Sequence, residues 1–205
     1  MDGFFFDSCS SLKSIHLAAG DDRIPIDDQL LAYFAGCSKL EELQLGGTLT
    51  YETLCKALET TDQLQPFKNI RLLLLYDMDS ISVPLLVKVL KGAKSLTALN
   101  ITPDDFDINP LPHVSSLVNL QQLYICSWCS SDWTRSDFLT LSNLKNLKGL
   151  LIRPLAGYLT CFDMTDEDFI SVFENLPELE ELEFPLDCEL SIASLNALGT
   201  CCPAE

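Results

Sequence analysis

A six-residue pattern of apolar residues recurs seven times along this chain. With Leu, Ile or Phe allowed at positions one, four and six, the motif L-x-x-L-x-L begins at residues 12, 40, 70, 96, 120, 147 and 179. The steps between these starts are 28, 30, 26, 24, 27 and 32 residues. Spacing this steady indicates a repeat protein, in which each unit packs mainly on its neighbours, rather than a single enzyme core.

Each motif has the alternation of a half-buried strand. The residue three places before it is always apolar, and the residue directly before it is usually polar and turn-forming. Because positions four and six lie on one side of a strand, we expect seven parallel strands in one sheet, with helices on its other face. The residues at position four are expected to be buried: Leu43, Leu73, Leu99, Leu123, Leu150 and Leu182.

Helix signals fall between the motifs. Four stretches carry suitable caps or helical spacing of apolar residues: 27–36, 51–58, 82–91 and 165–173. In the last of them Thr165 is a candidate N-cap, with Asp168 three residues later as in a capping box. The unit that starts at residue 96 is short, and its stretch at residues 104–112 holds two prolines, so we expect little more than one helical turn there.

These features resemble the leucine-rich-repeat family, and the resemblance covers essentially the whole chain. It implies an α/β fold, a solenoid shaped like the horseshoe of ribonuclease inhibitor. The parallel sheet would line its concave face and the helices its convex face. Residues 1–205 would then form a single solenoid of about seven units. The chain starts inside a unit and ends on C-C-P-A-E, where another strand is due, so we expect it to be part of a longer protein.

The spelling of the units narrows the resemblance. The C-x-x-L and C-C-P spellings with irregular unit lengths look like the repeats of F-box proteins, especially fungal ones. In that family the repeats hold the substrate of a ubiquitin ligase, although no F-box is recognisable here. The alternative is the repeat domain of an intracellular nucleotide-binding immune receptor, acting as a sensor or autoinhibitory module. An enzyme is a more distant alternative.

The charge of the chain is strongly negative and unevenly placed. The formal net charge is -17, and residues 161–205 carry 12 acids and no Lys or Arg. This composition argues against nucleic acid or an anionic membrane as a partner. The acidic end serves either solubility or docking to a basic protein surface. With no basic signal peptide and no bilayer-length apolar run, we expect a cytoplasmic or nuclear protein.

Two motifs with metal-like spacing are incomplete. Cys126 and Cys129 form C-x-x-C, but no second pair follows at zinc spacing, and an odd count of nine cysteines fits free thiols. The loop from Asp105 to Asn109 begins like a calcium loop but has Pro110 where Gly is needed. No cofactor motif and no catalytic set stands out, so we expect no metal, no cofactor and no enzymatic activity.

The candidate binding site lies on the open side of the strands. Motif positions three, five and seven face away from the core, and in the middle units they are apolar or aromatic where solvated positions should be polar. We therefore predict a partner-binding surface made of Leu72, Leu74, Tyr76, Tyr124 and Leu151, with Glu181 and Glu183 as an acidic flank. A covering loop is the alternative explanation. Trp128 and Trp133 either form a rim of this surface or plug the edge of the fold.

Overall fold

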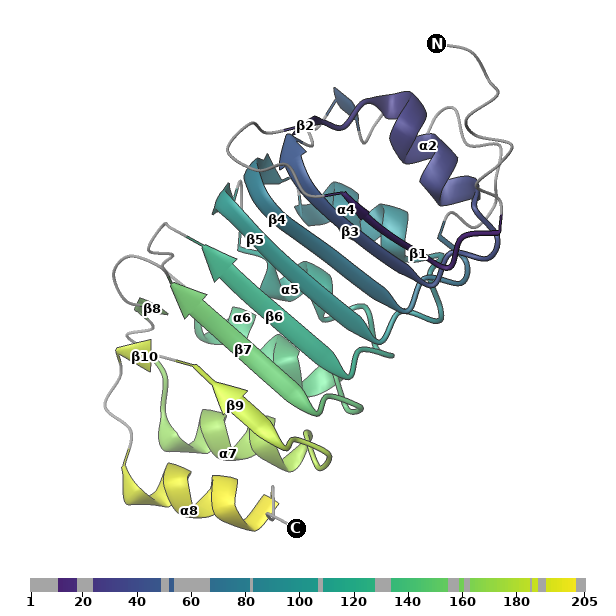
Figure 1. The fold of residues 1–205 in the computed structure, drawn as a ribbon. Coiled ribbons are helices and arrows are strands. Elements are labelled where there is room, and N and C mark those ends of the chain that lie inside the picture. Colours follow the sequence, from purple (N-terminus) through teal and green to yellow (C-terminus); the bar gives the residue numbers. More distant parts are fainter. Residues whose placement is uncertain are drawn as a thin grey trace.

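The fold is built on one parallel sheet. The computed structural model describes residues 11–17, 24–48, 52–53, 67–81, 83–106, 109–127, 134–154, 159–160, 163–184, 186–187 and 191–201. Within these ranges seven strands lie side by side in chain order (Figure 1). They are β1 (Ser14–Leu17), β3 (Glu42–Thr48), β4 (Leu72–Ile81), β5 (Ala98–Phe106), β6 (Gln122–Ser127), β7 (Gly149–Pro154) and β9 (Glu181–Glu183). Three two-residue strands add parallel pairs: β2 (Ile24–Pro25) with β3, and β8 (Leu159–Thr160) with β10 (Leu186–Asp187).

The register of the sheet follows the repeat. All seven strands begin at the third position of a motif, and neighbouring strands pair equivalent positions. Leu73 pairs with Leu43 on one side and with Leu99 on the other, and the same row continues to Leu123 and beyond. The prediction of seven parallel strands in one sheet is thereby confirmed. Differences in unit length are taken up by the connections between the strands.

The helices lie together behind the sheet (Figure 1). They are α2 (Asp28–Gly36), α4 (Val83–Leu90), α5 (Leu111–Val114), α6 (Arg135–Leu139) with the 3-10 turn η1 (Thr140–Asn143), α7 (Asp166–Glu174) and α8 (Ile192–Cys201). Three of the expected helices are confirmed as α2, α4 and α7. The single turn expected in the stretch with two prolines is α5, which begins directly after Pro110 and contains Pro112. The helix expected at 51–58 lies mostly outside the described residues. Within that range only residues 52–53 are described, and both are helical.

Local sequence explains where two of these helices begin. The carboxylate of Asp27 accepts a hydrogen bond of 2.7 Å from the Leu30 amide at the start of α2. At the start of α7, Thr165 and Asp168 form the complete capping box, in which each side chain bonds the backbone N–H of the other residue. Both caps satisfy amides that have no partner inside the helix.

The core lies between the sheet and the helices. Five of the six predicted position-four residues, Leu43, Leu73, Leu99, Leu123 and Leu150, are at most 3% exposed. The sixth prediction is wrong, because Leu182 is only partly buried. Its strand β9 closes the described sheet and has a neighbour, β7, on one side only.

The turns before the strands repeat as faithfully as the strands. In all six motifs with a described turn, the amide of the first motif residue donates to the carbonyl three residues earlier, at 3.2 Å or less. Asparagines directly before a motif tie one turn to the next: Asn119 donates to the Lys94 carbonyl and Asn146 to the Val118 carbonyl, both at 2.9 Å. These turns form one edge of the sheet, at the amino ends of its strands.

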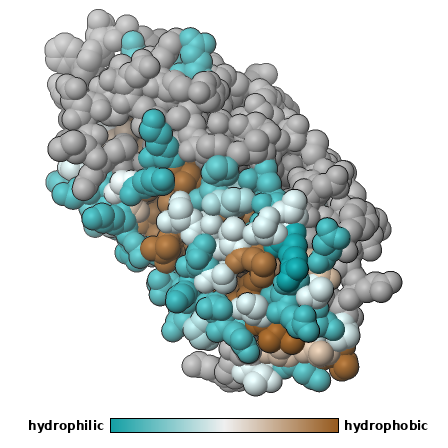
Figure 2. Space-filling model, turned by 180° about the vertical axis from the view of Figure 1, so that it is seen from behind, coloured by the Kyte–Doolittle hydropathy of each residue, from teal (hydrophilic) through white to brown (hydrophobic). Residues whose placement is uncertain are grey.

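The helical face is mainly hydrophilic. Seen from behind, the described surface carries mostly hydrophilic side chains, with small and separate hydrophobic patches (Figure 2). In the described ranges no helix has the length and apolar character needed to cross a bilayer.

Candidate functional site

The face of the sheet opposite the helices, called the open face below, carries the candidate site. No helix of the described chain covers it (Figure 1). Motif positions three, five and seven point to this face, and the parallel register brings equivalent side chains of successive units into rows. The sequence therefore decides, unit by unit, which chemistry each row presents.

The middle of the open face holds an apolar hollow. Its volume is ≈ 240 Å³. Four of the five predicted apolar and aromatic residues line it together: Leu72, Leu74, Tyr124 and Leu151. Ala98 of β5 leaves space between the larger side chains of β4 and β6, which is why the face is hollow at this point. In the described chain these side chains are only partly buried.

The fifth predicted residue, Tyr76, is not part of this hollow. Its ring leans toward β3 and lies over Gly46, its register partner. A Cβ atom added to Gly46 would come 2.5 Å from Tyr76 Cε2, so the ring fills the space that a side chain would occupy. The sequence contained a signal for this arrangement, because Gly46 and Tyr76 hold the same motif position in consecutive units.

A polar atom without a partner lies among the apolar side chains. Asn100 lines the hollow between Leu74 and Tyr124, and its side-chain oxygen is buried with no hydrogen-bond partner among the described atoms. A buried acceptor left unpaired costs about 1 to 3 kcal/mol. Asn100 was not among the predicted site residues, although its place at motif position five puts it on the same face as Leu74 and Tyr124.

A small polar cluster borders the hollow on the side of β7 and β9. Burial raises the pKa of the Tyr124 hydroxyl, and a hydrogen bond with Cys126 adds to the effect. Burial likewise raises the pKa of the Cys126 thiol, which is free. Both groups are therefore neutral at physiological pH. Next to them, Arg153 donates two hydrogen bonds of 2.6 Å each to the Glu183 carboxylate. These bonds hold the pKa of Glu183 below its usual value.

Because of this ion pair, the two acids of the predicted flank differ in their surroundings. Glu183 is already neutralised by Arg153, whereas Glu181 of the same strand is exposed and forms no ion pair with a described residue. The two acids were predicted to act together on a basic partner. Of these two acids, Glu181 alone presents a carboxylate without an ion pair among the described residues.

Several other candidates are resolved only in part. Trp128, Trp133 and Cys129 lie outside the described residues. Within the described ranges no three His, Cys, Asp or Glu side chains come together as a metal site. Asn109, from the loop that resembled a calcium site, instead bonds the Leu111 amide at 3.0 Å and the Asp137 carboxylate at 2.9 Å.

One pair with catalytic residue types occurs on the open face. Ser14 Oγ lies 2.9 Å from His16 Nε2 on β1. Both residues are exposed, and no described carboxylate is hydrogen-bonded to the imidazole. The pair therefore lacks the orienting third group and the sheltered setting that nucleophilic catalysis uses.

In comparisons with known proteins, no protein-family model matches the sequence, and no curated protein matches it significantly.

Proposed function

We propose that the chain is a leucine-rich-repeat-like solenoid that binds another protein through its open face, which would be the concave one. Three regularities support the solenoid. The strands start at one motif position, the register joins equivalent residues, and the same turn hydrogen bond recurs before each described motif. The main contacts between elements join neighbouring units, which is the arrangement expected of a stack of repeats.

The hollow around Asn100 is the observation that carries the binding proposal. Leu72, Leu74 and Leu151 form an apolar wall that gains from losing water, and Tyr124 supplies an aromatic anchor. The unpaired Asn100 oxygen needs a donor. A partner that inserts an apolar side chain and places an N–H group beside it satisfies both demands at once.

A protein partner fits this surface better than a small molecule. The hollow of ≈ 240 Å³ is below the roughly 300 to 1,000 Å³ typical of small-molecule pockets, and it is open rather than enclosed. Anchor sites in protein interfaces are of this kind, with a few apolar and aromatic side chains at the centre and polar residues around them. Arg153, Glu183 and Glu181 supply such a polar border.

The proposal is tested by site-specific photo-crosslinking in native lysate. A benzoylphenylalanine placed at Leu151 on the open face should capture a distinct protein, identified by mass spectrometry. Adding Tyr124→Ala to the same chain should remove most of that adduct, because loss of an anchor costs at least about 1 kcal/mol. Benzoylphenylalanine at Lys88, exposed on α4, is the matched control for the helical face.

The outcome separates the two faces of the molecule. Adducts that form equally from Leu151 and Lys88, or that persist unchanged with Tyr124→Ala, would show that the open face is not the binding surface. Thermal unfolding of each variant ensures that a lost adduct reflects lost binding rather than lost folding.

A further inference from the structure

The turns that lead into β4, β5, β6 and β7 carry positive charge in a strongly acidic protein. We call residues 67–71, 93–97, 117–121 and 144–148 together the turn rim. They contain five cations, Lys68, Arg71, Lys94, Lys145 and Lys148, and no Asp or Glu. Lys91 lies just outside it, at the end of α4. The whole chain, by contrast, has a net charge of -17.

Most of these cations are available to a partner. Lys148 is held by Glu180 at 3.1 Å and by Glu178 at 3.8 Å. The other five, counting Lys91, are exposed and form no ion pair with a described carboxylate, although Glu41 attracts Arg71 at longer range: Lys68, Arg71, Lys91, Lys94 and Lys145. Residues 83–100 and 109–124 contain no acid, so no carboxylate within these two stretches offsets Lys91 and Lys94.

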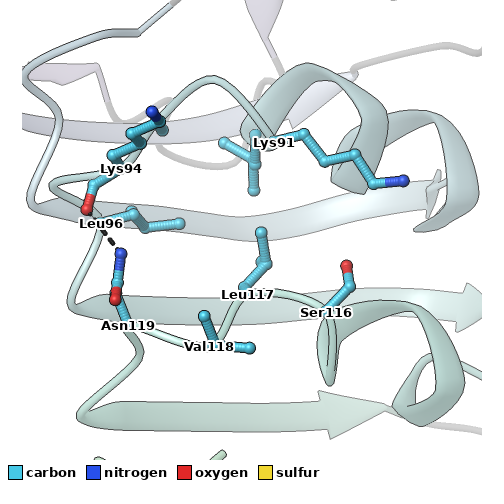
Figure 3. Close-up of a pocket in the computed structure, with 9 residues that line it drawn as sticks. Lys91, Lys94, Leu96, Ser116, Leu117, Val118 and Asn119 are labelled. Carbon is cyan, nitrogen blue, oxygen red and sulfur yellow. Dashed lines mark hydrogen bonds between the residues drawn. The ribbon is translucent and has the colours of Figure 1, made fainter.

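A second hollow opens on the turn rim between these units. It has a volume of ≈ 250 Å³ and is lined by Leu90, Leu117 and Val118 together with Lys91, Lys94 and Asn119. Figure 3 shows the apolar side chains in its middle, with Lys94 at one end and Lys91 at the other. Val118 is 51% exposed and is one of four exposed large apolar residues in the described part of the chain.

The walls of this hollow are held in place by the backbone. Asn119 donates to the Lys94 carbonyl at 2.9 Å, and the Leu96 and Leu120 amides close their turns at 3.0 Å. A ligand would meet a preformed surface and would not have to order it, which lowers the entropy cost of binding.

We propose that the turn rim binds an acidic segment of another protein, an extended stretch of Asp and Glu residues whose single bulky apolar side chain occupies the hollow beside Val118. The apolar side chain would cover Leu117 and Val118, while carboxylates on either side would reach Lys91 and Lys94. Lys68 and Arg71 lie toward β4 and Lys145 toward β7, so the charges continue in both directions.

The dimensions favour a short extended peptide. Adjacent strands lie about 4.8 Å apart, so the rim from β4 to β7 spans roughly 15 Å, which about five extended residues cover. At physiological salt, screening limits exposed charges to about 8 Å, so such a segment senses the rim rather than the net charge of the chain. A nucleic acid would extend well beyond the rim toward residues 161–205, whose 12 acids repel it.

The test measures binding of labelled peptides by fluorescence anisotropy. The first peptide contains Asp and Glu residues around one central Leu, the second has Ser in place of that Leu, and the third has Asn and Gln in place of the acids. The Leu peptide should bind saturably and more weakly as salt rises. The Ser peptide should bind about tenfold more weakly, because it buries no apolar side chain. The uncharged peptide should not bind.

Variants of the protein locate the contact. Lys94→Glu should weaken the Leu peptide about tenfold, since it replaces an attraction by a repulsion. Val118→Ser should weaken the Leu peptide but leave the Ser peptide unchanged. Lys88→Glu makes the same charge change outside the hollow and should alter affinity less than about twofold. Tyr124→Ala, on the open face, should have no effect, which keeps this test separate from the proposed open-face function.

Four results would overturn the inference. They are absence of saturable binding by the Leu peptide, equal binding of the Leu and Ser peptides, equal effects of Lys94→Glu and Lys88→Glu, and displacement of the peptide by single-stranded RNA or anionic vesicles at comparable concentration. Analytical ultracentrifugation tests the other possible occupant, a second copy of this chain. Self-association that Lys94→Glu abolishes would assign the rim to the acidic end of a second copy of this chain.

Discussion

The ring of Tyr76 lies over the backbone of Gly46, its register partner on the neighbouring strand, where an added Cβ atom would fall 2.5 Å from ring carbon Cε2. Gly46→Ala should therefore displace the ring and destabilise the protein by about 1 to 3 kcal/mol, measured by urea unfolding. In a Tyr76→Ala background the same change should cost much less. An equal cost in both backgrounds would mean that the ring does not occupy this space.

The strand phase makes a second prediction about the core. Leu123 is fully buried at position four of its motif, whereas Leu182 holds the same position on β9, the edge strand of the large sheet, and is only partly buried. Leu123→Ala should cost about 2 to 5 kcal/mol in unfolding free energy, and Leu182→Ala clearly less. A loss well below 1 kcal/mol at Leu123 would contradict the assigned strand phase.

A buried carboxylate links two helices. Asp168 is 4% exposed and accepts hydrogen bonds from the Thr165 amide at 3.0 Å, the Thr165 hydroxyl at 2.8 Å and Arg135 Nε at 2.8 Å. Burial by itself raises the pKa of Asp168, but the bonds from Thr165 and Arg135 outweigh it, so the pKa is lowered from its ordinary value of 3.8.

Asp168→Asn should lose this charge-assisted contact and about 1 to 3 kcal/mol at neutral pH. Because the folded pKa is lowered, the stabilisation is complete above the unfolded pKa and disappears as pH falls through the folded value. The difference between parent and variant in urea unfolding should thus shrink below about pH 3.8. A difference that stays constant down to acid pH would indicate a packing defect instead.

The pair Arg153 and Glu183 gives a prediction that NMR can check directly. The hydrogen bonds from Arg153 lower the pKa of Glu183 from its ordinary value of 4.5. Arg153→Gln should therefore raise the pKa of Glu183 toward 4.5. The measurement is the chemical shift of the Glu183 carboxyl carbon as a function of pH. The internal control is Glu41, whose pKa is lowered mainly by Lys13 and should be the same in parent and variant.

The sheet could be predicted from the repeat, but the details of its open face could not. Apolar residues at motif positions four and six allow one burial phase, so the strand starts, the register and the buried row follow from spacing alone. The direction in which Tyr76 leans depends on the missing side chain of Gly46 on another strand, which no single unit reveals. The partial exposure of Leu182 depends on what lies beyond β9.

Charge contacts between units were the hardest to foresee. Glu183 was predicted to face a partner, yet Arg153 sits two motif positions further along the preceding strand and reaches it diagonally. Arg135 reaches Asp168 across 33 residues, from a helix that was not predicted although Thr134 and Asp137 form the same capping box as Thr165 and Asp168. Contacts of this kind depend on side-chain length and direction rather than on the period of the repeat.

Asn100 provides the last prediction, because stability and binding should respond to it in opposite directions. Its buried oxygen has no described partner in the free protein, so Asn100→Leu removes an unsatisfied acceptor and adds apolar surface beside Leu74 and Tyr124. The free energy of unfolding should rise by about 1 kcal/mol. Capture through benzoylphenylalanine at Leu151 should fall, because the partner loses the acceptor for its N–H group. Asn100→Asp, which keeps an acceptor oxygen, should retain more of the adduct than Asn100→Leu. If Asn100→Leu instead lowers stability and leaves capture intact, the oxygen is satisfied in the free protein and the hollow does not recognise a donor.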